Sequence, residues 1–330
     1  MRILLAGLIA VVSSHSIAGE LPQEIREAVQ KIGPVINAPE TAKLLAPLQR
    51  KEPYAGVAIT RDERYGSDER HRLDVFRPND AASALPVLLF IHGGGYERGD
   101  KRAAGSPFYD NVMLWAVEHR MVGVNMTYRL APANPWPAAI EDIAVAVAWT
   151  YANIARFGGD PDRIVLMGHS AGATHVSSYL SHPEIGGKSP VRAAAAILVS
   201  GTYDLKPDID APGQPSYFGS DTALWLDRSS IAGLTKTTVP LLIAHGELDV
   251  PYYVNQADAL KARLCRESKC PTFVSLAGQS HMSEIYGLNT NDTSCPSRCD
   301  RLSSRLRRGS YATSAKVLGE RMYASGQKLT

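Results

Sequence analysis

The sequence predicts an α/β fold, with a mostly parallel, doubly wound sheet covered by helices on both faces. Short, continuous apolar runs alternate along the chain with longer segments of helical spacing, which is typical of parallel strands buried on both sides. One run, from Arg163 to Met167, leads directly into Gly168-His169-Ser170-Ala171-Gly172, and helical residues follow at once. This Gly-x-Ser-x-Gly pattern between a strand and a helix places Ser170 at the tip of a sharp turn.

The chain before Ser170 supplies the first half of the predicted sheet. Two short helices are expected at 21–32 and 40–49, because glycine and proline interrupt the helical spacing between them. Strands at 56–60 and 72–76, separated by a polar turn, indicate an antiparallel start to the sheet. The other elements expected here are a strand at 86–91, a helix at 107–120, a strand at 121–127 and a helix at 137–157.

The chain after Ser170 continues the alternation, with a helix at 173–180 and strands at 193–199, 239–244 and 272–276. Two segments interrupt it. Residues 203–238 mix prolines with aromatic side chains, as an insertion above a binding site would, and residues 289–308 form a polar surface loop. Because no repeat or linker divides the chain, we predict one α/β domain over residues 19–330.

The first residues have the pattern of a signal peptide. Arg2 gives a positive start, Ile3 to Val12 is an uncharged apolar run, and Ser16 and Ala18 are small residues suited to cleavage after Ala18. The apolar run is shorter than the roughly 20 residues that a membrane-spanning helix needs. We therefore predict that residues 1–18 are removed on export to the periplasm or the medium, without a stable membrane anchor.

The charge balance does not favour a nucleic acid as partner. The 35 basic and 33 acidic residues leave a net charge of +2, so no bulk electrostatic attraction to a polyanion is expected. Arginines at 301–308 are interpreted as a solvated face. The sequence gives no indication of an oligomeric state.

The four cysteines fit an exported protein. Cys265, Cys270, Cys295 and Cys299 lie close together near the end of the chain, and an even number predicts two disulfides. Three pairings exist, of which we expect the local ones. A zinc site made of all four thiolates is the open alternative.

The residues that would form a catalytic triad with Ser170 follow it in the order acid, then histidine. Two apolar strands late in the chain run into loops that hold Asp249 and His281. A serine hydroxyl is a poor nucleophile until an imidazole takes its proton, and a buried carboxylate fixes the tautomer of that ring. We therefore predict a triad of Ser170, His281 and Asp249, which requires no metal and no organic cofactor.

A glycine-rich segment predicts the site for a negative oxygen. The strand at 86–91 ends in His92-Gly93-Gly94-Gly95-Tyr96, where backbone N–H groups are not obstructed by a Cβ. The N–H groups of Gly93, Gly94 and Ala171 are predicted to form an oxyanion hole.

Alternatives stay open for three of these assignments. Glu247 could replace Asp249 as the acid, and Asp249 would then cap a helix. His281 could be a structural histidine. His92 and His169 are interpreted as structural, and a substrate contact by either remains an alternative.

The combined motifs resemble the α/β-hydrolase superfamily, and within it the carboxylesterases related to hormone-sensitive lipase. The resemblance covers about residues 65–281. Its motifs are His92-Gly93-Gly94-Gly95, Tyr128-Arg129-Leu130-Ala131-Pro132 with Pro137-Ala138-Ala139 and Glu141-Asp142, Gly158-Gly159-Asp160-Pro161, and the Ser170 turn. Tyr65-Gly66-Ser67-Asp68 with the segment 73–78 is also similar to the feruloyl-esterase and kynurenine-formamidase-like branch. The chain departs from the family in its short segment before Tyr65 and in its tail after His281.

The resemblance implies the α/β-hydrolase fold and a serine esterase that acts on small-molecule carboxylic esters. A preference for short acyl groups or compact aromatic acids is expected from the composition of residues 203–238. An arylformamidase or amidase with the same triad is the second hypothesis. The third is a non-catalytic binding protein of this fold, a class that usually lacks the serine or the histidine. Because residues 203–238 are broken by prolines, they suit a compact pocket better than a lipase lid. The candidate substrate contacts are Tyr96, Tyr217, Phe218 and Trp225.

Overall fold

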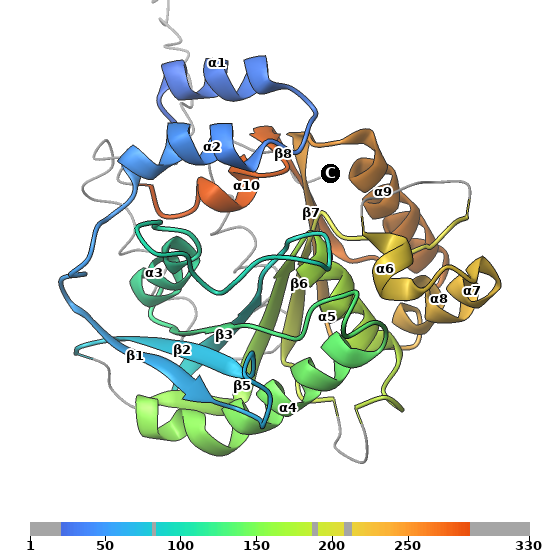
Figure 1. Cartoon of the computed structure of the whole chain (residues 1–330), viewed down its shortest axis with the longest axis horizontal. Helices are drawn as coiled ribbons and strands as arrows, with labels where there is room; N and C mark the ends of the chain where they lie inside the picture. The colour runs from blue at the N-terminus through green and yellow to red at the C-terminus, as the bar shows by residue number, and fades with distance from the viewer. Residues whose placement is uncertain (1–20, 81–83, 187–190, 208–212, 291–330) are drawn as a thin grey trace, which may run out of the picture.

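The computed structural model describes residues 21–80, 84–186, 191–207 and 213–290. These residues build one eight-stranded sheet in the order β1-β2-β4-β3-β5-β6-β7-β8, with helices on both faces (Figure 1). The strands are β1 (Val57–Arg64), β2 (Arg72–Pro78), β3 (Leu85–Ile91), β4 (Val122–Met126), β5 (Gly159–His169), β6 (Ala195–Val199), β7 (Leu241–Leu248) and β8 (Thr272–Ser280). The predicted α/β fold with a mostly parallel sheet is confirmed.

Strand direction brings several loops to one edge of the sheet. β2 pairs antiparallel with β1 and with β4, which confirms the predicted antiparallel start. From β4 through β3 and β5 to β8, every neighbouring pair is parallel. Because parallel strands end at the same edge, the loops after β3, β5, β7 and β8 lie together there, as expected for a binding site in this class of sheet.

The helices cover two large apolar cores, one on each face of the sheet, and α1 and α2 pack in a third, smaller cluster. They are α1 (Gln23–Ile32), α2 (Ala38–Leu45), α3 (Asp110–Glu118), α4 (Ala138–Asn153), α5 (Ala171–Ser181), α6 (Gln214–Phe218), α7 (Trp225–Arg228), α8 (Ile231–Leu234), α9 (Pro251–Arg266) and α10 (Ser283–Tyr286), with 3₁₀ turns at Ala46–Leu48, Ile154–Phe157 and Thr222–Leu224. Successive residues of β3 alternate between the cores: Leu88 and Phe90 pack with α3, and Leu89 packs with α4 and α5. The β3 side chains from Val87 to Ile91 are therefore all buried, which explains the continuous apolar sequence there.

The helix α9 was not predicted from the sequence. Its buried residues Tyr253, Ala257, Leu260 and Leu264 do recur at helical spacing, but charged and polar residues on the other face obscure this pattern. The insertion at 203–238 also contains short helices, α6 to α8, and α8 contacts both α5 and α9.

Both ends of the described chain lie beside β8. α1 contacts β8, and α2 contacts α10 (Figure 1). A disulfide joins Cys265 at the end of α9 to Cys270 before β8, which is the expected local pairing for these two residues. Cys295, Cys299, the predicted signal peptide at 1–18 and most of the loop at 289–308 lie outside the described residues. None of the helices in the described ranges is both long and apolar enough to cross a membrane.

Candidate active site

The turn that carries Ser170 joins β5 to α5 and leaves no room for larger neighbours. Ser170 has φ 56° and ψ −124°, a backbone conformation that residues with a Cβ rarely adopt. A Cβ on Gly168 would lie 2.3 Å from the carbonyl oxygen of Gly172, and one on Gly172 would lie 2.1 Å from that of Ile91. The flanking glycines are therefore required for the close crossing of β5, α5 and the end of β3.

The structure brings Ser170, His281 and Asp249 into one hydrogen-bonded chain, although the loops that hold them are distant in sequence. The Oγ of Ser170 lies 2.9 Å from Nε2 of His281, and Nδ1 of that ring lies 2.8 Å from Oδ1 of Asp249. Ser170 is 7% exposed, so it meets the surface only at its tip, while His281 and Asp249 are buried. This is the nucleophile, base and orienting acid arrangement that serine hydrolases share.

Asp249 rather than Glu247 faces the imidazole. It lies just before α9, and its Oδ1 also accepts a hydrogen bond from the backbone N–H of Val250 at 2.6 Å. Burial raises the pKa of Asp249, but the adjacent His281 and these hydrogen bonds outweigh burial, so the pKa lies below its ordinary value. Glu247 is exposed and accepts from the N–H of Gly278 at 2.8 Å. The geometry thus favours an ionised Asp249 as the orienting acid.

The glycine segment after β3 lies against Ser170. A Cβ on Gly93 would lie 3.0 Å from the Cβ of Ser170, so the two residues are in contact. Gly94 has φ 135°, which suits glycine alone. Among the hydrogen bonds of the described residues, the N–H groups of Gly93, Gly94 and Ala171 have no acceptor. They remain available to an oxyanion beside Ser170.

His92 and His169 support these loops. The ring of His92 donates from Nδ1 to the carbonyl of Gly93 at 2.6 Å, and Nε2 of His169 donates to the carbonyl of His281 at 2.8 Å. Burial lowers the pKa of each ring to about 4, so both are neutral at neutral pH. Their complete burial fits the structural interpretation of these two histidines.

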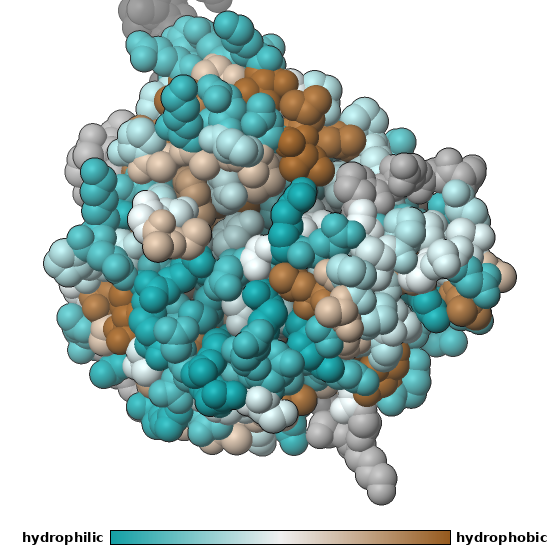
Figure 2. Space-filling view, in the orientation of Figure 1, coloured by the Kyte–Doolittle hydropathy of each residue, from teal (hydrophilic) through white to brown (hydrophobic). Residues whose placement is uncertain are grey.

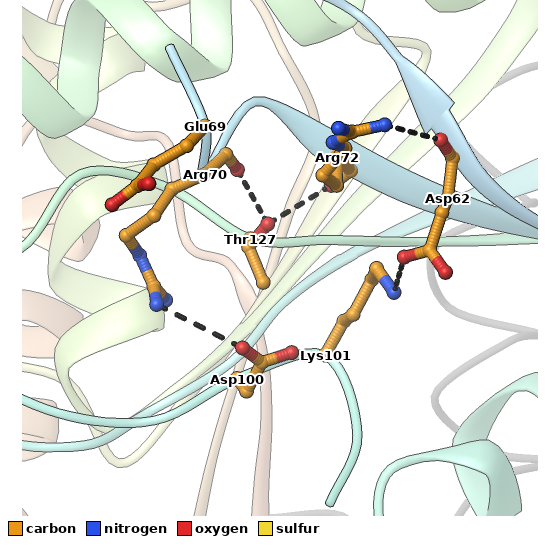
Figure 3. Close-up of a pocket in the computed structure, with 7 residues that line it drawn as sticks. All are labelled: Asp62, Glu69, Arg70, Arg72, Asp100, Lys101 and Thr127. Carbon is orange, nitrogen blue, oxygen red and sulfur yellow. Dashed lines mark hydrogen bonds and ion pairs between the residues drawn. The ribbon is translucent and has the colours of Figure 1, made fainter.

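A polar cleft is lined in part by Asp100 and Lys101 from the loop after β3 (Figure 3). The side chain of Arg70 donates to the carbonyls of Gly99 and Tyr128 and so ties the loops after β3 and β4 together. The residues that line the cleft are Asp62, Glu69, Arg70, Arg72, Asp100, Lys101 and Thr127. Its buried Lys101 is already paired with Asp62 of β1 and Asp74 of β2, so these ion pairs tie the loop after β3 to the first two strands.

The four predicted substrate contacts form a buried cluster. Tyr96 stacks on Tyr217 with ring centroids 5.2 Å apart, and Phe218 meets both rings edge-on. Trp225 donates from its indole to the carbonyl of Gly219. None of the four is more than 4% exposed, so these aromatics fix the insertion to the body and offer little free surface to a ligand.

Tyr253, on the first turn of α9, was not identified from the sequence. Its ring lies 4.4 Å from that of His281, centroid to centroid, and its hydroxyl interacts with the side chain of Ser170. A predicted helix at 251–266 would have pointed to it, because the first turn of that helix directly follows the loop that holds Asp249.

His169, His281 and Glu284 form a group of potential metal ligands in the described part of the chain. The two ring nitrogens of His281 are already engaged by Ser170 and Asp249, and Nε2 of His169 carries the proton that it donates to a carbonyl. A metal ion here would have to displace these hydrogen bonds. The donor set therefore fits a triad better than a metal centre.

Comparison with known proteins agrees with this geometry. Residues 73–183 match the family model BD-FAE. The chain is 30% identical over 272 residues to the probable carboxylic ester hydrolase LipM of Mycobacterium tuberculosis, covering 75% of this chain and 61% of LipM. It is 28% identical to Esterase LipC of the same organism, covering 69% of this chain and 61% of LipC. The chain thus spans about three fifths of the length of these curated relatives.

Solved structures show the same fold. Esterase B from Lactobacillus rhamnosis superposes with a TM-score of 0.66 at 17% identity, over 92% of this chain and 97% of that one. A bacterial heroin esterase gives a TM-score of 0.61 at 21% identity, over 89% and 96%. These likenesses and the sequence relatives lead to one conclusion: the chain has the α/β-hydrolase fold and is homologous to carboxylesterases.

Proposed function

We propose that the protein is an exported serine esterase that hydrolyses small carboxylic esters through an acyl-enzyme on Ser170. The observation that carries the proposal is the continuous hydrogen-bonded chain from Ser170 through His281 to Asp249, next to the N–H groups of Gly93, Gly94 and Ala171. The homologous relatives are described as esterases, which supports the same activity.

In the acylation step, Oγ of Ser170 attacks the ester carbonyl while its proton moves to Nε2 of His281. The carbonyl oxygen becomes negative and accepts hydrogen bonds from the oxyanion N–H groups. The imidazolium is stabilised by the ionised Asp249 at 2.8 Å. His281 then gives the proton to the leaving alcohol, and the carbonyl re-forms as an ester of Ser170.

Deacylation repeats these steps with water as the nucleophile. His281 takes a proton from the water as its oxygen attacks the acyl-enzyme, and it returns the proton to Oγ of Ser170 as the acid leaves. Tyr253 is placed to hydrogen-bond with Ser170 and to hold the His281 ring from one side. Every proton in the cycle is carried by groups of the chain or by substrate and water.

Small substrates are favoured by the insertion and by the surface. The described part of the insertion contains only helices of four or five residues, which are too short to form the amphipathic lid of a lipase. Figure 2 shows a mostly hydrophilic face on which hydrophobic residues form separate areas, one of them beside the α1–α2 connection. A structural neighbour, Esterase B, has been solved with a tributyrin phosphonate inhibitor.

A panel of aryl esters with increasing acyl length tests the substrate proposal. We expect kcat/KM to rise by up to about fourfold per methylene, the equivalent of ~0.8 kcal/mol, and then to fall beyond roughly six carbons when the chain meets the pocket wall. A kcat/KM that keeps rising to about twelve carbons, or jumps when substrate forms an interface, would identify a lipase. An aryl formamide and an anilide in the same panel test the formamidase and amidase hypothesis directly.

Export with cleavage after Ala18 is part of the proposal. It is supported by the N-terminal pattern and by the Cys265–Cys270 disulfide, since disulfides persist in oxidising compartments. The intact mass of the protein purified from an exporting host is expected to correspond to a chain that begins at Gly19 with no free thiol. A mass that retains residues 1–18, four titratable thiols or one bound zinc per chain would contradict this part of the proposal.

A further inference from the structure

A second carboxyl group lies buried beside the triad. Glu284 follows His281 at the start of α10, and its side chain has no exposed surface. Its Oε1 lies 3.3 Å from Nε2 of His169, and it interacts with the N–H of Gly246 at the end of β7. Ser200, at the end of β6, interacts with both Glu284 and Asp249. The loops after four strands thus meet at this carboxyl group.

The buried groups around Glu284 include fewer hydrogen-bond donors than acceptors. Within the described residues, Oδ2 of Asp249, both carboxyl oxygens of Glu284 and Oγ of Ser200 lack a hydrogen-bond partner of standard geometry. The proton on Nε2 of His169 is already shared with the carbonyl of His281 at 2.8 Å. If both carboxyl groups were ionised, buried acceptors would outnumber donors, which is costly. A proton on Glu284 supplies the missing donor.

The charges lead to the same conclusion. Burial lowers the pKa of His169 to about 4, so this neighbour is neutral and cannot neutralise a Glu284 carboxylate. The other titratable groups that interact with Glu284 are Asp249 after β7, His281 after β8, Tyr203 after β6 and Tyr253 on α9. His281 can balance only one negative charge, and Asp249 already holds its Nδ1. A second buried carboxylate would remain uncompensated.

We propose that Glu284 is a positioning residue that stays protonated and donates a hydrogen bond to Ser200, whose hydroxyl donates in turn to Asp249. The inference deepens the proposed esterase function and rests on it. The donated hydrogen bond orients Asp249 so that Oδ1 faces His281, and it disperses part of the carboxylate charge. Because a stronger negative charge favours the protonated imidazole, this dispersal helps to keep His281 free to accept the Ser170 proton. Burial first, and then the nearby Asp249, raise the pKa of Glu284 well above its ordinary value, in agreement.

Two variants of Glu284 test this role through the pH dependence of kcat/KM. Glu284→Leu removes the donor, so we expect kcat to fall about tenfold, the usual effect of losing a hydrogen bond to a charged group, and the acid limb of the profile to move to higher pH. Glu284→Gln keeps a neutral donor of the same shape, so we expect a loss of only about threefold and an acid limb that stays in place. Glu247→Gln, which changes an exposed carboxyl group at the end of β7, is the control.

The direction in which the acid limb of the kcat/KM profile moves shows whether Glu284 is protonated in the wild type. If Glu284 were ionised in the wild type, both variants would remove a negative charge near His281, and the acid limb would move to lower pH. An acid limb that moves down in either variant, or that stays in place in Glu284→Leu, overturns the proposal.

Unfolding measurements test the protonation without using activity. A raised pKa means that the folded state keeps a proton that the unfolded state releases above about pH 4.3, so the wild type should lose stability relative to Glu284→Gln as pH rises from there. Urea unfolding of both proteins across this range measures the difference, and a difference with the opposite slope overturns the proposal. Reaction with an alkyl phosphonate reports separately on the proposed function: failure to label Ser170 contradicts the esterase, while the unfolding result still decides the state of Glu284.

Discussion

Ser170→Ala is expected to lower kcat on a short-chain aryl ester by about 10⁴-fold or more, and His281→Ala by a similar factor. The alanine removes the atom that forms the acyl-enzyme, and loss of the imidazole leaves the serine hydroxyl without a base at 2.9 Å. Because the two residues act as one unit, we expect the double variant to lose little more than either single variant.

Steady-state kinetics and the mass of the phosphonate adduct measure this loss. The wild type should gain one adduct on Ser170, and the alanine variant none. Ser181→Ala is a suitable control, because this serine lies at the end of the same helix and donates only to the carbonyl of Ser178. Turnover near the wild-type rate in a Ser170→Ala protein free of contaminating esterase would exclude the whole mechanism.

Asp249→Asn is expected to lower kcat by about 10³- to 10⁴-fold with little change in KM. The asparagine has the same shape, but its amide can present N–H to Nδ1 of His281. The ring would then adopt the tautomer that carries its proton on Nε2, the nitrogen that must accept the Ser170 proton. The effect is smaller than that of losing Ser170, because the nucleophile and the oxyanion N–H groups remain.

Glu247→Gln separates the two acids that the sequence left open. Glu247 is exposed and contacts Gly278, and a glutamine oxygen can still accept this hydrogen bond. We expect activity within about twofold of the wild type, as for most exposed substitutions. The assignment of the acid would be reversed if Glu247→Gln lost activity and Asp249→Asn retained it. Circular dichroism of both variants shows whether a loss reflects misfolding.

The sequence by itself determined the fold class and the elements around Ser170. Alternation of apolar strands and helices requires parallel strands, and parallel strands end at the same edge of the sheet. This rule is enough to predict that the loops holding Gly93, Ser170, Asp249 and His281 meet, although each is far from the others along the chain. The glycines around Ser170 follow from the same local pattern, because the turn at φ 56° depends on its immediate neighbours.

Only the tertiary structure decided which side chains reach each other across that edge. It placed Asp249, and not Glu247, against His281, since the two differ in direction from the end of β7. It also buried Tyr96 and Tyr217 against each other, whereas the sequence had predicted that these aromatic side chains line a substrate pocket. It also brought Tyr253 and Glu284 to the triad from α9 and α10. Such contacts depend on how helices pack over the sheet and on the direction in which each side chain points. The residue pattern of a single strand or helix does not encode these relations between distant segments.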